Sequence, residues 1–379
     1  MTHLVLYTLP ILLLLLGCVR PHPAAMVNAA VTEAREDSLA LAAAYAGQAL
    51  IGRSVTATVE TAAARATNLE DAADDPAIWI HPTDPARSLV FGSNKTSGLA
   101  AYDLSGREVA YYAIGNVNNV DILTDVPLGG KRITLLGASN RTNQAIDLYR
   151  VDEETGALTD VADGLLAMDS TLIDDIYGFC LGRSGDTVYA IANGKNGRLQ
   201  QFALEDRGGR FGLRRVREHG FPSQTEGMVA DNELGWLYVG EEAAGIWKMP
   251  LAADAVPVGP VLLKDRVSHP QALVADVEGL TLYRRPDGGG YLVASMQGNF
   301  SYALFDRAGD NAYLGSFTIR DGRVDGVEET DGLEVVSTPL PGFSGGLLVV
   351  QDGFNYDGDS LRPQNFKYVD FGTVLNWEL

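Results

Sequence analysis

Positive charge is scarce in this chain of 379 residues. Lysine and arginine number 29 against 49 aspartates and glutamates, which gives a formal net charge of −20. Such a charge repels nucleic acids and anionic membranes at long range, so we expect neither as an unaided partner. An acidic protein can still bind an anionic ligand if metal ions lie between the two.

A long apolar run is also lacking. The run over residues 4–16 is too short for a comfortable transmembrane helix and is typical of a signal peptide. It ends in Leu-Leu-Gly-Cys, which resembles the bacterial lipoprotein cleavage box, in which Cys18 becomes the lipidated N-terminus. Ordinary signal-peptidase cleavage is the alternative. We therefore predict a signal peptide at 1–18, a leader or tether at 19–53 and a main domain at 54–379.

This division predicts an exported protein. It is either a periplasmic, outer-membrane or cell-surface lipoprotein or a secreted protein, and it meets a membrane only through a lipid anchor at Cys18. We expect a monomer.

Cysteine and histidine are few, with two and five residues respectively. With Cys18 assigned to the leader, Cys180 has no intrachain partner, which excludes a disulfide framework. We expect Cys180 to be a small buried apolar residue. The histidines do not form a spaced ligand set, so nothing indicates a zinc site.

Convincing amphipathic helices are absent from the main domain, whereas the 42 glycines favour many tight turns and an all-β fold. From Asp74 onward a two-part sequence motif recurs at intervals of about fifty residues. An acidic or tyrosyl residue, usually followed by glycine, opens an apolar stretch. A second strand follows roughly sixteen to twenty residues later and ends in a polar hairpin. The six openings read DDPAIWI, NVDIL, IYGFCL, TEGMVA, VEGLTL and TDGLEV.

Six such copies predict a six-bladed β-propeller. A unit of this length cannot bury both faces alone, and radial closure leaves few exposed sheet edges. We expect the strand-like segment 55–61 to pair with the last blade and latch the ring. Two unrelated sandwiches are the alternative, but they give no reason for a six-fold period.

Equivalent positions of successive blades form rings around the central channel of a propeller. From the start of each unit we predict a first ring of Asp75, Asp121, Tyr177, Glu226, Glu278 and Asp331. From the hairpins we predict a second ring of Lys95, Arg141, Lys195, Glu242, Gln297 and Asp352. The second ring is split by sign, with cations from the first three blades and acids or an amide from the last three.

This arrangement predicts metal-assisted phosphate chemistry. Carboxylates brought together repel one another, so a cation is expected among them, and carboxylate and amide oxygens suit several Ca²⁺ ions. Lysine and arginine on the other side present donors to a tetrahedral oxyanion. Water activated by calcium can then attack phosphorus without a covalent nucleophile. The sequence shows no GxSxG elbow, no credible Ser/His/Asp set and no RHG motif.

The same segments resemble the β-propeller phytases. The resemblance runs in order from about residue 55 to the C-terminus and includes DDPAIWIHPTDPARSLVFGSNKTSGLAAYDLSG, ASNR, NGKNG, EGMVADNELGWLYVGEE and ASMQGNFSYALF. It implies calcium-dependent hydrolysis of phytate, with one phosphate cleaved while a neighbouring one is gripped nearby. The implied enzyme is a phosphomonoesterase.

By motif, the resemblance implies two sets of residues. The catalytic set, which contacts phosphate, is Lys95, Arg141, Tyr177 and Lys195, joined by Glu226. The calcium-binding set is Asp74, Asp75, Glu226, Glu242, Asp276, Glu278, Gln297 and Asp331. Thr96, Asn196 and Leu123 stand where the family often has charged residues, so accessory phosphate contacts are not implied there.

Two other functions stay open at this point. A non-catalytic, calcium-stabilised surface propeller predicts stability that depends on calcium without phosphate release. A propeller lactonase uses a single divalent metal and needs no cationic triad, so Lys95, Arg141 and Lys195 argue against it.

Overall fold

The structure is a computed structural model that describes residues 38–68, 70–255, 261–265 and 273–377. The predicted signal peptide and most of the predicted tether lie outside the described residues. The chain divides into two units, 1–42 and 43–379. In the first unit, the described residues 38–42 are helical. Within the described ranges, no helix is both long enough and apolar enough to cross a membrane.

In the described part of the second unit, six sheets of four or five strands follow one another along the chain, and one further sheet has two strands. Blade 1 comprises β3 (Ala73–Trp79), β4 (Leu89–Asn94), β5 (Gly98–Asp103) and β6 (Glu108–Tyr112). Blade 2 comprises β7 (Val117–Leu128), β8 (Lys131–Asn140), β9 (Ala145–Val151) and β10 (Leu158–Asp160), with β11 (Leu166–Ala167) paired to β9. Blade 3 comprises β12 (Ile176–Ser184), β13 (Thr187–Gly194), β14 (Arg198–Asp206) and β15 (Phe211–Gly220).

The remaining blades repeat this order. Blade 4 comprises β16 (Thr225–Asp231), β17 (Trp236–Glu241), β18 (Gly245–Pro250) and β19 (Val261–Asp265). Blade 5 comprises β20 (Val277–Arg284), β21 (Gly290–Met296), β22 (Ser301–Asp306) and β23 (Tyr313–Arg320). Blade 6 comprises β24 (Leu333–Val336), β25 (Leu347–Asp352) and β28 (Asn365–Asp370). The short elements are η1 (Pro85–Arg87), η2 (Gln297–Asn299), the hairpin β26 (Tyr356–Asp357) and β27 (Ser360–Leu361), and α2 (Gly372–Leu375).

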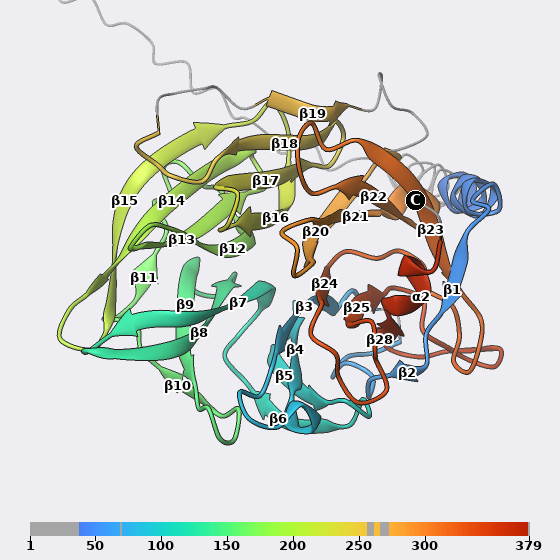
Figure 1. Cartoon of the computed structure of the whole chain (residues 1–379), viewed down its shortest axis with the longest axis horizontal. Helices are drawn as coiled ribbons and strands as arrows, with labels where there is room; N and C mark the ends of the chain where they lie inside the picture. Colours follow the sequence, from blue (N-terminus) through green and yellow to red (C-terminus); the bar gives the residue numbers. More distant parts are fainter. Residues whose placement is uncertain (1–37, 69, 256–260, 266–272, 378–379) are drawn as a thin grey trace, which may run out of the picture. The chain divides into compact units, whose positions relative to one another are not determined.

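The six sheets stand side by side around a central axis, which confirms the predicted six-bladed β-propeller (Figure 1). Each of six hydrophobic clusters of described residues joins one sheet to the next. In β25, Leu347 and Val349 pack towards blade 1, whereas Leu348 and Val350 pack towards blade 5. Because both faces of a blade are covered, the strand has a continuous apolar run rather than alternation. Cys180 is free and buried between blades 3 and 4, as predicted.

The N-terminal strands close the ring. β1 (Ser54–Thr56) pairs parallel with β23 of blade 5, and β2 (Val59–Glu60) pairs antiparallel with β28 as the outer strand of blade 6. The latch onto the last blade is therefore confirmed, and its first part adds to blade 5 as well. The buried Lys367 Nζ donates to Glu60 Oε2 at 2.6 Å, which ties β2 to β28.

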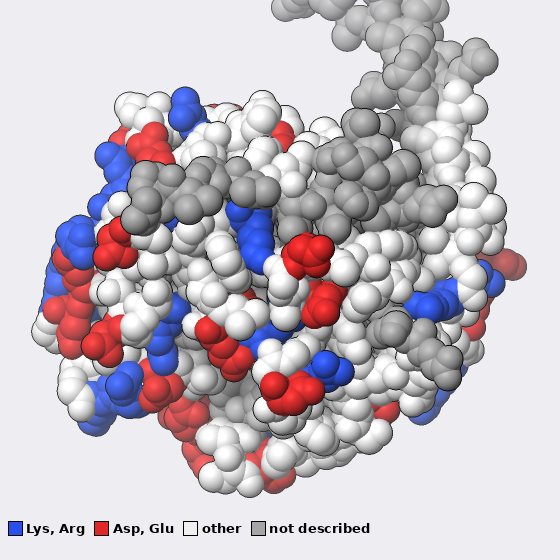
Figure 2. Space-filling view, turned by 45° about the horizontal axis from the view of Figure 1, so that its top comes forward, with Lys and Arg blue, Asp and Glu red and all other residues white. Residues whose placement is uncertain are grey.

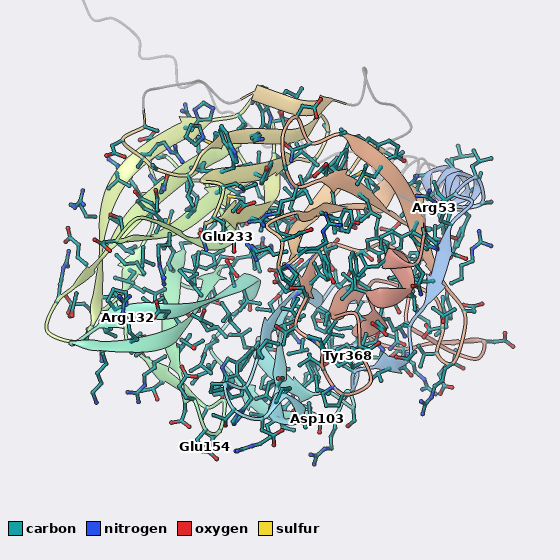
Figure 3. The ribbon with its side chains drawn as sticks, in the orientation of Figure 1. Arg53, Asp103, Arg132, Glu154, Glu233 and Tyr368 are labelled. Atoms are coloured by element: carbon teal, nitrogen blue, oxygen red, sulfur yellow. The ribbon has the colours of Figure 1, made fainter. Side chains whose placement is uncertain are left out.

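Blade 6 also packs directly on blade 1. Tyr368 of β28 is fully buried in the cluster that these two blades share, and its hydroxyl lies 3.4 Å from the Asp103 carbonyl oxygen (Figure 3). Segments from both ends of the domain thus meet at one boundary. A pocket is likewise lined by residues that are remote in sequence, such as Lys95, Glu242 and Gln364.

The glycines of the repeat openings have a structural reason. A Cβ atom at Gly178 would overlap the carbonyl oxygen of Glu226 in the next blade, and one at Gly227 would overlap that of Glu278. The inner strands therefore approach closely only because glycine follows the ring residue. This close approach brings the side chains of consecutive blades into one site.

Candidate active site

The inner strands of blades 1 to 5 each carry a β-bulge where they begin. The register shifts there enclose Asp74-Asp75, Asn118-Asn119, Tyr177-Gly178, Glu226-Gly227 and Glu278-Gly279. A bulge re-aims the side chain that it carries. The first residue of each pair is therefore the ring position, and the site is built on a repeated distortion of the inner strand.

This frame corrects two members of the predicted first ring. Asp74 and Asn118, not Asp75 and Asp121, occupy the positions equivalent to Tyr177. The prediction matched acidic residues across the copies, whereas the bulge sets the true alignment. Asp75 and Asp121, together with Glu334, line a separate inner cavity of about 30 Å³.

Asp75 and Asp121 accept hydrogen bonds from neighbouring blades. Asp75 Oδ2 accepts from the Val120 N–H at 3.0 Å, and Asp121 Oδ2 accepts from the Leu181 N–H at 2.7 Å. Burial raises the pKa of Asp75 well above its usual range. Asp75, one of the eight predicted calcium ligands, thus lines this inner cavity and not the main cavity; Asp74 and Glu226 are also not among the residues that line the main cavity.

The second ring sits in the turns that follow the second strand of each blade. The N–H groups of Lys95, Arg141 and Lys195 donate to the carbonyl oxygens of Ala72, Asn116 and Asp175 at 2.7, 2.8 and 3.3 Å. Each acceptor lies two residues before a ring position. The backbone therefore fixes every cation next to the first ring.

Blade 6 departs from this pattern. The Gly353 N–H donates to the Glu328 carbonyl oxygen at 2.8 Å, so Gly353 rather than Asp352 is the turn residue there. Asp352 is the last residue of β25, and its Oδ2 lies 3.3 Å from Lys367 Nζ. Asp352 was therefore wrongly placed in the second ring, because its buried carboxylate pairs with Lys367 inside blade 6.

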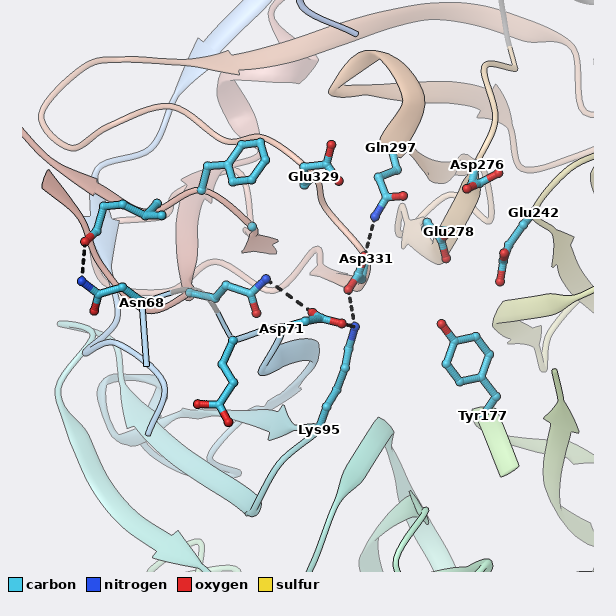
Figure 4. A pocket seen from close by; sticks show the side chains of 15 residues that line it. Asn68, Asp71, Lys95, Tyr177, Glu242, Asp276, Glu278, Gln297, Glu329 and Asp331 are labelled. Carbon is cyan, nitrogen blue, oxygen red and sulfur yellow. Dashed lines mark hydrogen bonds and ion pairs between the residues drawn. The ribbon is translucent and has the colours of Figure 1, made fainter. Parts of the chain in front are cut away.

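The cavity beside the two rings, the main cavity of this site, has a volume of about 460 Å³ (Figure 4). Its lining includes the predicted site residues Lys95, Tyr177, Glu242, Asp276, Glu278, Gln297 and Asp331. Glu329, Asp71, Glu70 and Asn68 add further polar groups to its wall. Residues from blades 1, 3, 4, 5 and 6 thus converge on one pocket.

Three glutamates form the acidic centre of the site. One carboxylate oxygen each of Glu226, Glu242 and Glu278 lies within 4.8 Å of the others. Asn118 Nδ2 donates to Glu226 Oε1 at 2.6 Å, and Gln224 Nε2 donates to Glu242 Oε1 at 2.7 Å. These two amides hold the carboxylates in place but bring no positive charge.

The cluster is electrostatically unfavourable by itself. Burial and the neighbouring Glu226 raise the pKa of Glu278 well above its usual range and that of Glu242 to about 7. Glu278 Oε2 is buried and has no hydrogen-bond partner among the described residues. Three hard oxygen donors at this separation, one of them orphaned, fit a divalent metal ion.

Lys95 joins this centre to blade 6. Its Nζ lies 2.6 Å from Asp331 Oδ2, 2.9 Å from Asp71 Oδ2 and 3.5 Å from Asp74 Oδ1. Burial lowers the pKa of Lys95, but the three carboxylates outweigh it, so the pKa is raised overall. Gln297 Nε2 donates to Asp331 Oδ1 at 2.7 Å.

Burial disfavours the ionised form of Asp74 and Asp331 and raises the pKa of both carboxyl groups. The pKa of Asp331 is raised to about 6 because burial outweighs the attraction of Lys95. Neither carboxylate oxygen of Asp74 has a hydrogen-bond partner in the described part of the chain. Both residues are therefore suited to receive a second cation beside Lys95.

The ring of Tyr177 lies near both Arg141 of blade 2 and Lys195 of blade 3. Lys195 Nζ lies 4.7 Å and Arg141 Cζ 5.8 Å from the centre of the Tyr177 ring. Burial, followed by Glu226 and Asp74, raises the pKa of Tyr177, so its hydroxyl remains a hydrogen-bond donor at neutral pH. Arg141 Nη2 donates to Asp175 Oδ2 at 2.6 Å.

The two groups of charges are therefore close neighbours. Lys95 contacts Asp331, and the charges of Glu226, Asp74 and Glu278 all act on Tyr177. Asn118 is the contributor that the sequence analysis missed. The signal that identifies it is an alignment of NNVDI with DDPAI, in which Asn118-Asn119 is matched to Asp74-Asp75.

The three departures noted in the sequence do not disturb this arrangement. Thr96 donates through its N–H and Oγ1 to Asn94 Oδ1 at 2.8 and 2.7 Å. The Asn196 N–H donates to Asp174 Oδ1 at 3.1 Å. Leu123 packs against the core between blades 2 and 3. All three positions serve local structure.

Outside the cavity, charges of both signs are interspersed (Figure 2). Arginines on and beside β14 and β15 pair with acids, in Arg207–Asp163, Arg210–Asp160, Arg214–Glu205 and Arg215–Asp169. Such exposed pairs neutralise one another. The separation of charge seen in the cavity is thus a local property of the site.

Comparison with known proteins decides which family has this site. A family model described as Phytase matches residues 24–377. The 3-phytase of Bacillus subtilis (strain 168) is 42% identical over 316 residues, which cover 82% of this chain and 80% of that protein.

The chain belongs to the phytase family. The family prediction is confirmed, and so is the prediction of a phosphoric monoester hydrolase. This assignment decides against the lactonase and against the non-catalytic propeller. A solved β-propeller domain, that of Myceliophteria thermophila Cps50 (Swd1), matches with a TM-score of 0.42 at 13% identity and covers 78% of this chain and 82% of that chain.

Proposed function

We propose that this phytase-family chain is a calcium-dependent enzyme that hydrolyses the phosphate monoesters of phytate. The observation that supports this most strongly is the meeting of opposite charges in one cavity. Lys95 lies 2.6 Å from Asp331, while Glu226, Glu242 and Glu278 face one another without a protein cation between them. A polyanionic substrate fits between the protein's own cations and metal ions held by the acids.

The residues that would hold calcium are the three glutamates, with Asp74, Asp276, Gln297 and Asp331 beside them. The orphaned oxygens of Glu278 and Asp74 support this assignment. Calcium, when bound, supplies an acidified water and positive charge against the phosphoryl oxygens. Calcium is larger than magnesium and tolerates irregular arrangements of oxygen ligands, so it suits a cluster of ligands that come from several blades.

The chain's own residues then bind and orient the phosphate. Lys95, Arg141 and Lys195 donate N–H groups to phosphoryl oxygens, and the Tyr177 hydroxyl adds a neutral donor. We assign Glu226 to orient the attacking water. The water oxygen forms the new bond to phosphorus, the ester P–O bond breaks, and the inositol oxygen leaves as a hydroxyl group with a proton that the attacking water gives up. No covalent nucleophile is required.

Phosphate release tests this proposal. Purified protein incubated with phytate and calcium is expected to release inorganic phosphate, and excess chelator is expected to stop the release until calcium is restored. Magnesium in place of calcium serves as the control for a general divalent effect. Absence of release in calcium would refute the proposed activity.

We also propose that the protein is exported, is anchored through Cys18 and acts as a monomer. The support is the apolar run and the Leu-Leu-Gly-Cys sequence, both of which lie outside the described residues. Expression of the full chain and of Cys18→Ser in a bacterium, followed by detergent phase partitioning, tests the anchor. The wild type is expected in the detergent phase and the variant in the aqueous phase. Equal partitioning of the two would contradict lipidation, and gel filtration of the variant checks its size.

A further inference from the structure

Arg141 makes one ion pair among the described residues, and the charge of Asp74 also acts on it. Its Nη2 donates to Asp175 Oδ2 at 2.6 Å, and no other acceptor for its guanidinium occurs among the described residues. The two side chains are 26% and 30% exposed, so the pair is partly shielded from bulk solvent. The remaining N–H groups of Arg141 stay available to an anion.

Asp175 is itself held by a second residue. Gln144 Nε2 donates to Asp175 Oδ1 at 2.7 Å and to the Arg141 carbonyl oxygen at 2.9 Å. Gln144 Oε1 accepts from the Ile176 N–H at 2.8 Å. One amide side chain thus bridges the turn of blade 2 that carries Arg141 and the start of the inner strand of blade 3.

Gln144 adopts a left-handed conformation to make this bridge. Its φ angle is 48°, a region that costs a non-glycine residue of order 1 kcal/mol unless surrounding contacts support it. Its carbonyl oxygen accepts from the Met168 N–H at 2.9 Å. The strained position is therefore fixed on both its main-chain and its side-chain sides.

The same aspartate also reaches the second cation. The Lys195 N–H donates to the Asp175 carbonyl oxygen at 3.3 Å, and the Asp175 N–H donates to Asp174 Oδ1 at 2.8 Å. Asp175 therefore contacts Arg141 through its side chain and Lys195 through its main chain. Both cations lie over the ring of Tyr177.

We propose that Asp175 is a positioning residue that, together with Gln144, holds Arg141 at the spacing from Lys195 that one phosphate group requires. The inference rests on the proposed function of this site. Asp175 touches neither the metal cluster nor the main cavity wall, so it acts through Arg141. Burial raises the pKa of Asp175, but the hydrogen bonds from Arg141 and Gln144 outweigh it and keep the carboxylate ionised.

The opposite role would be competition, in which Asp175 occupies Arg141 and must release it when substrate binds. The geometry favours positioning, because the carboxylate takes a single N–H group of Arg141 and is locked by Gln144 on its other oxygen. A guanidinium pinned at one edge loses less side-chain entropy on binding phosphate than a free one.

A double-mutant cycle tests the inference. Asp175→Ala, Arg141→Ala and the double variant are compared with the wild type in phytate hydrolysis with calcium. Asp175→Ala is expected to lower kcat/KM by roughly 10- to 100-fold, mainly through KM, because the grip on the substrate is lost. In the Arg141→Ala background, the same change is expected to cost less than about 3-fold.

Two further variants secure the result. Asp175→Asn keeps the shape and one acceptor, so it is expected to fold as the wild type does and to lose less than Asp175→Ala. It decides the test if the alanine variant fails to fold. Asp169→Asn makes the same charge change on the same connecting segment, at a residue paired with Arg215 away from the cavity, and is expected to change nothing.

The outcomes separate the two proposals. Unchanged or improved kcat/KM in Asp175→Ala and Asp175→Asn would overturn positioning, as would an equal loss in the presence and absence of Arg141. A wild type that releases no phosphate from phytate would overturn the proposed function instead. Calorimetric binding of phytate to the wild type and to Asp175→Asn, in calcium, would then still show whether the aspartate positions an anion-binding arginine.

Discussion

Blades 1 to 3 and blades 4 to 6 bring side chains of different charge to the site. The turns of the first half carry Lys95, Arg141 and Lys195, and each of these cations contacts a protein carboxylate or an aromatic ring. The second half brings together Glu226, Glu242 and Glu278, which the described residues leave without a cation. The cations of the first half already have partners in the protein, whereas the three glutamates of the second half need an added positive charge. The repeat and its β-bulges set where these groups lie, and the residue types at those positions divide the site into a substrate side and a metal side.

The substitution with the largest expected effect removes Lys95, the cation that pairs with three carboxylates. Lys95→Met leaves Asp71, Asp74 and Asp331 facing one another, so we expect kcat/KM on phytate to fall by about 1000-fold. Stability without calcium is expected to fall by about 3 kcal/mol, because a buried pair has lost one partner. Phosphate release and urea unfolding measure the two effects.

The control for that variant is Lys131→Met, which removes an exposed lysine at the start of β8 and is expected to change neither quantity. Full activity in Lys95→Met would show that the cationic half does not grip the substrate.

The pH dependence of stability sharpens the contrast. Burial raises the pKa of Glu242 to about 7, that of Asp331 to about 6 and that of Glu328 to about 8, whereas these groups titrate near 4 in the unfolded chain. Between roughly pH 5 and 8 the folded state therefore binds more protons than the unfolded state, and its stability falls as pH rises. Chelated protein is expected to melt several degrees lower at pH 8 than at pH 5.5.

Calcium is expected to reduce this slope by the share of Glu242 and Asp331, because a bound cation keeps these two carboxylates ionised in the folded state. Differential scanning calorimetry with chelator and with calcium across this pH range makes the measurement. A chelated protein whose melting temperature rises with pH would contradict the raised pKa values.

A single substitution in the acidic half is expected to act in the opposite sense to Lys95→Met. Glu278→Gln removes one of three repelling carboxylates and the orphaned oxygen's charge, so chelated protein is expected to gain about 1 kcal/mol. The same change is expected to weaken calcium binding and to shrink the calcium-induced rise in melting temperature. Calorimetry on both forms measures the two signs. A loss of stability in chelator would show that the glutamates are not in mutual repulsion.

The sequence predicted the architecture because the repeat and its glycines carry a packing requirement. Gly178 and Gly227 follow the ring residues since the next blade leaves no room for a Cβ atom. The pattern could not show the β-bulges, which set the frame one residue away from Asp75 in blade 1 and made Asn118 the ring residue of blade 2. Nor could it show that Lys367 pairs with Asp352, because that pair depends on how β25 and β28 meet. Residue types repeat along the chain, but the direction of each side chain is set by local backbone distortion.

The smallest expected effect comes from adding a positive charge to blades 1 to 3, which already carry three cations at the site. Thr96 lies beside Lys95, half-buried, with its N–H and hydroxyl bonded to Asn94. Thr96→Lys keeps the main-chain bond and adds an ammonium group near the cavity mouth, so KM for phytate is expected to fall by about 2- to 3-fold at low salt and to return to the wild-type value at about 0.5 M salt. The change is small because an exposed charge is screened and the substrate already meets three cations. Rates measured in calcium at both salt concentrations test this, with Thr142→Lys in the next blade's turn as the matched comparison. A gain in affinity that persists at high salt would mean that the side chain at position 96 contacts the substrate directly. The cations of blades 1 to 3 would then not be the full set of phosphate contacts in that half of the site.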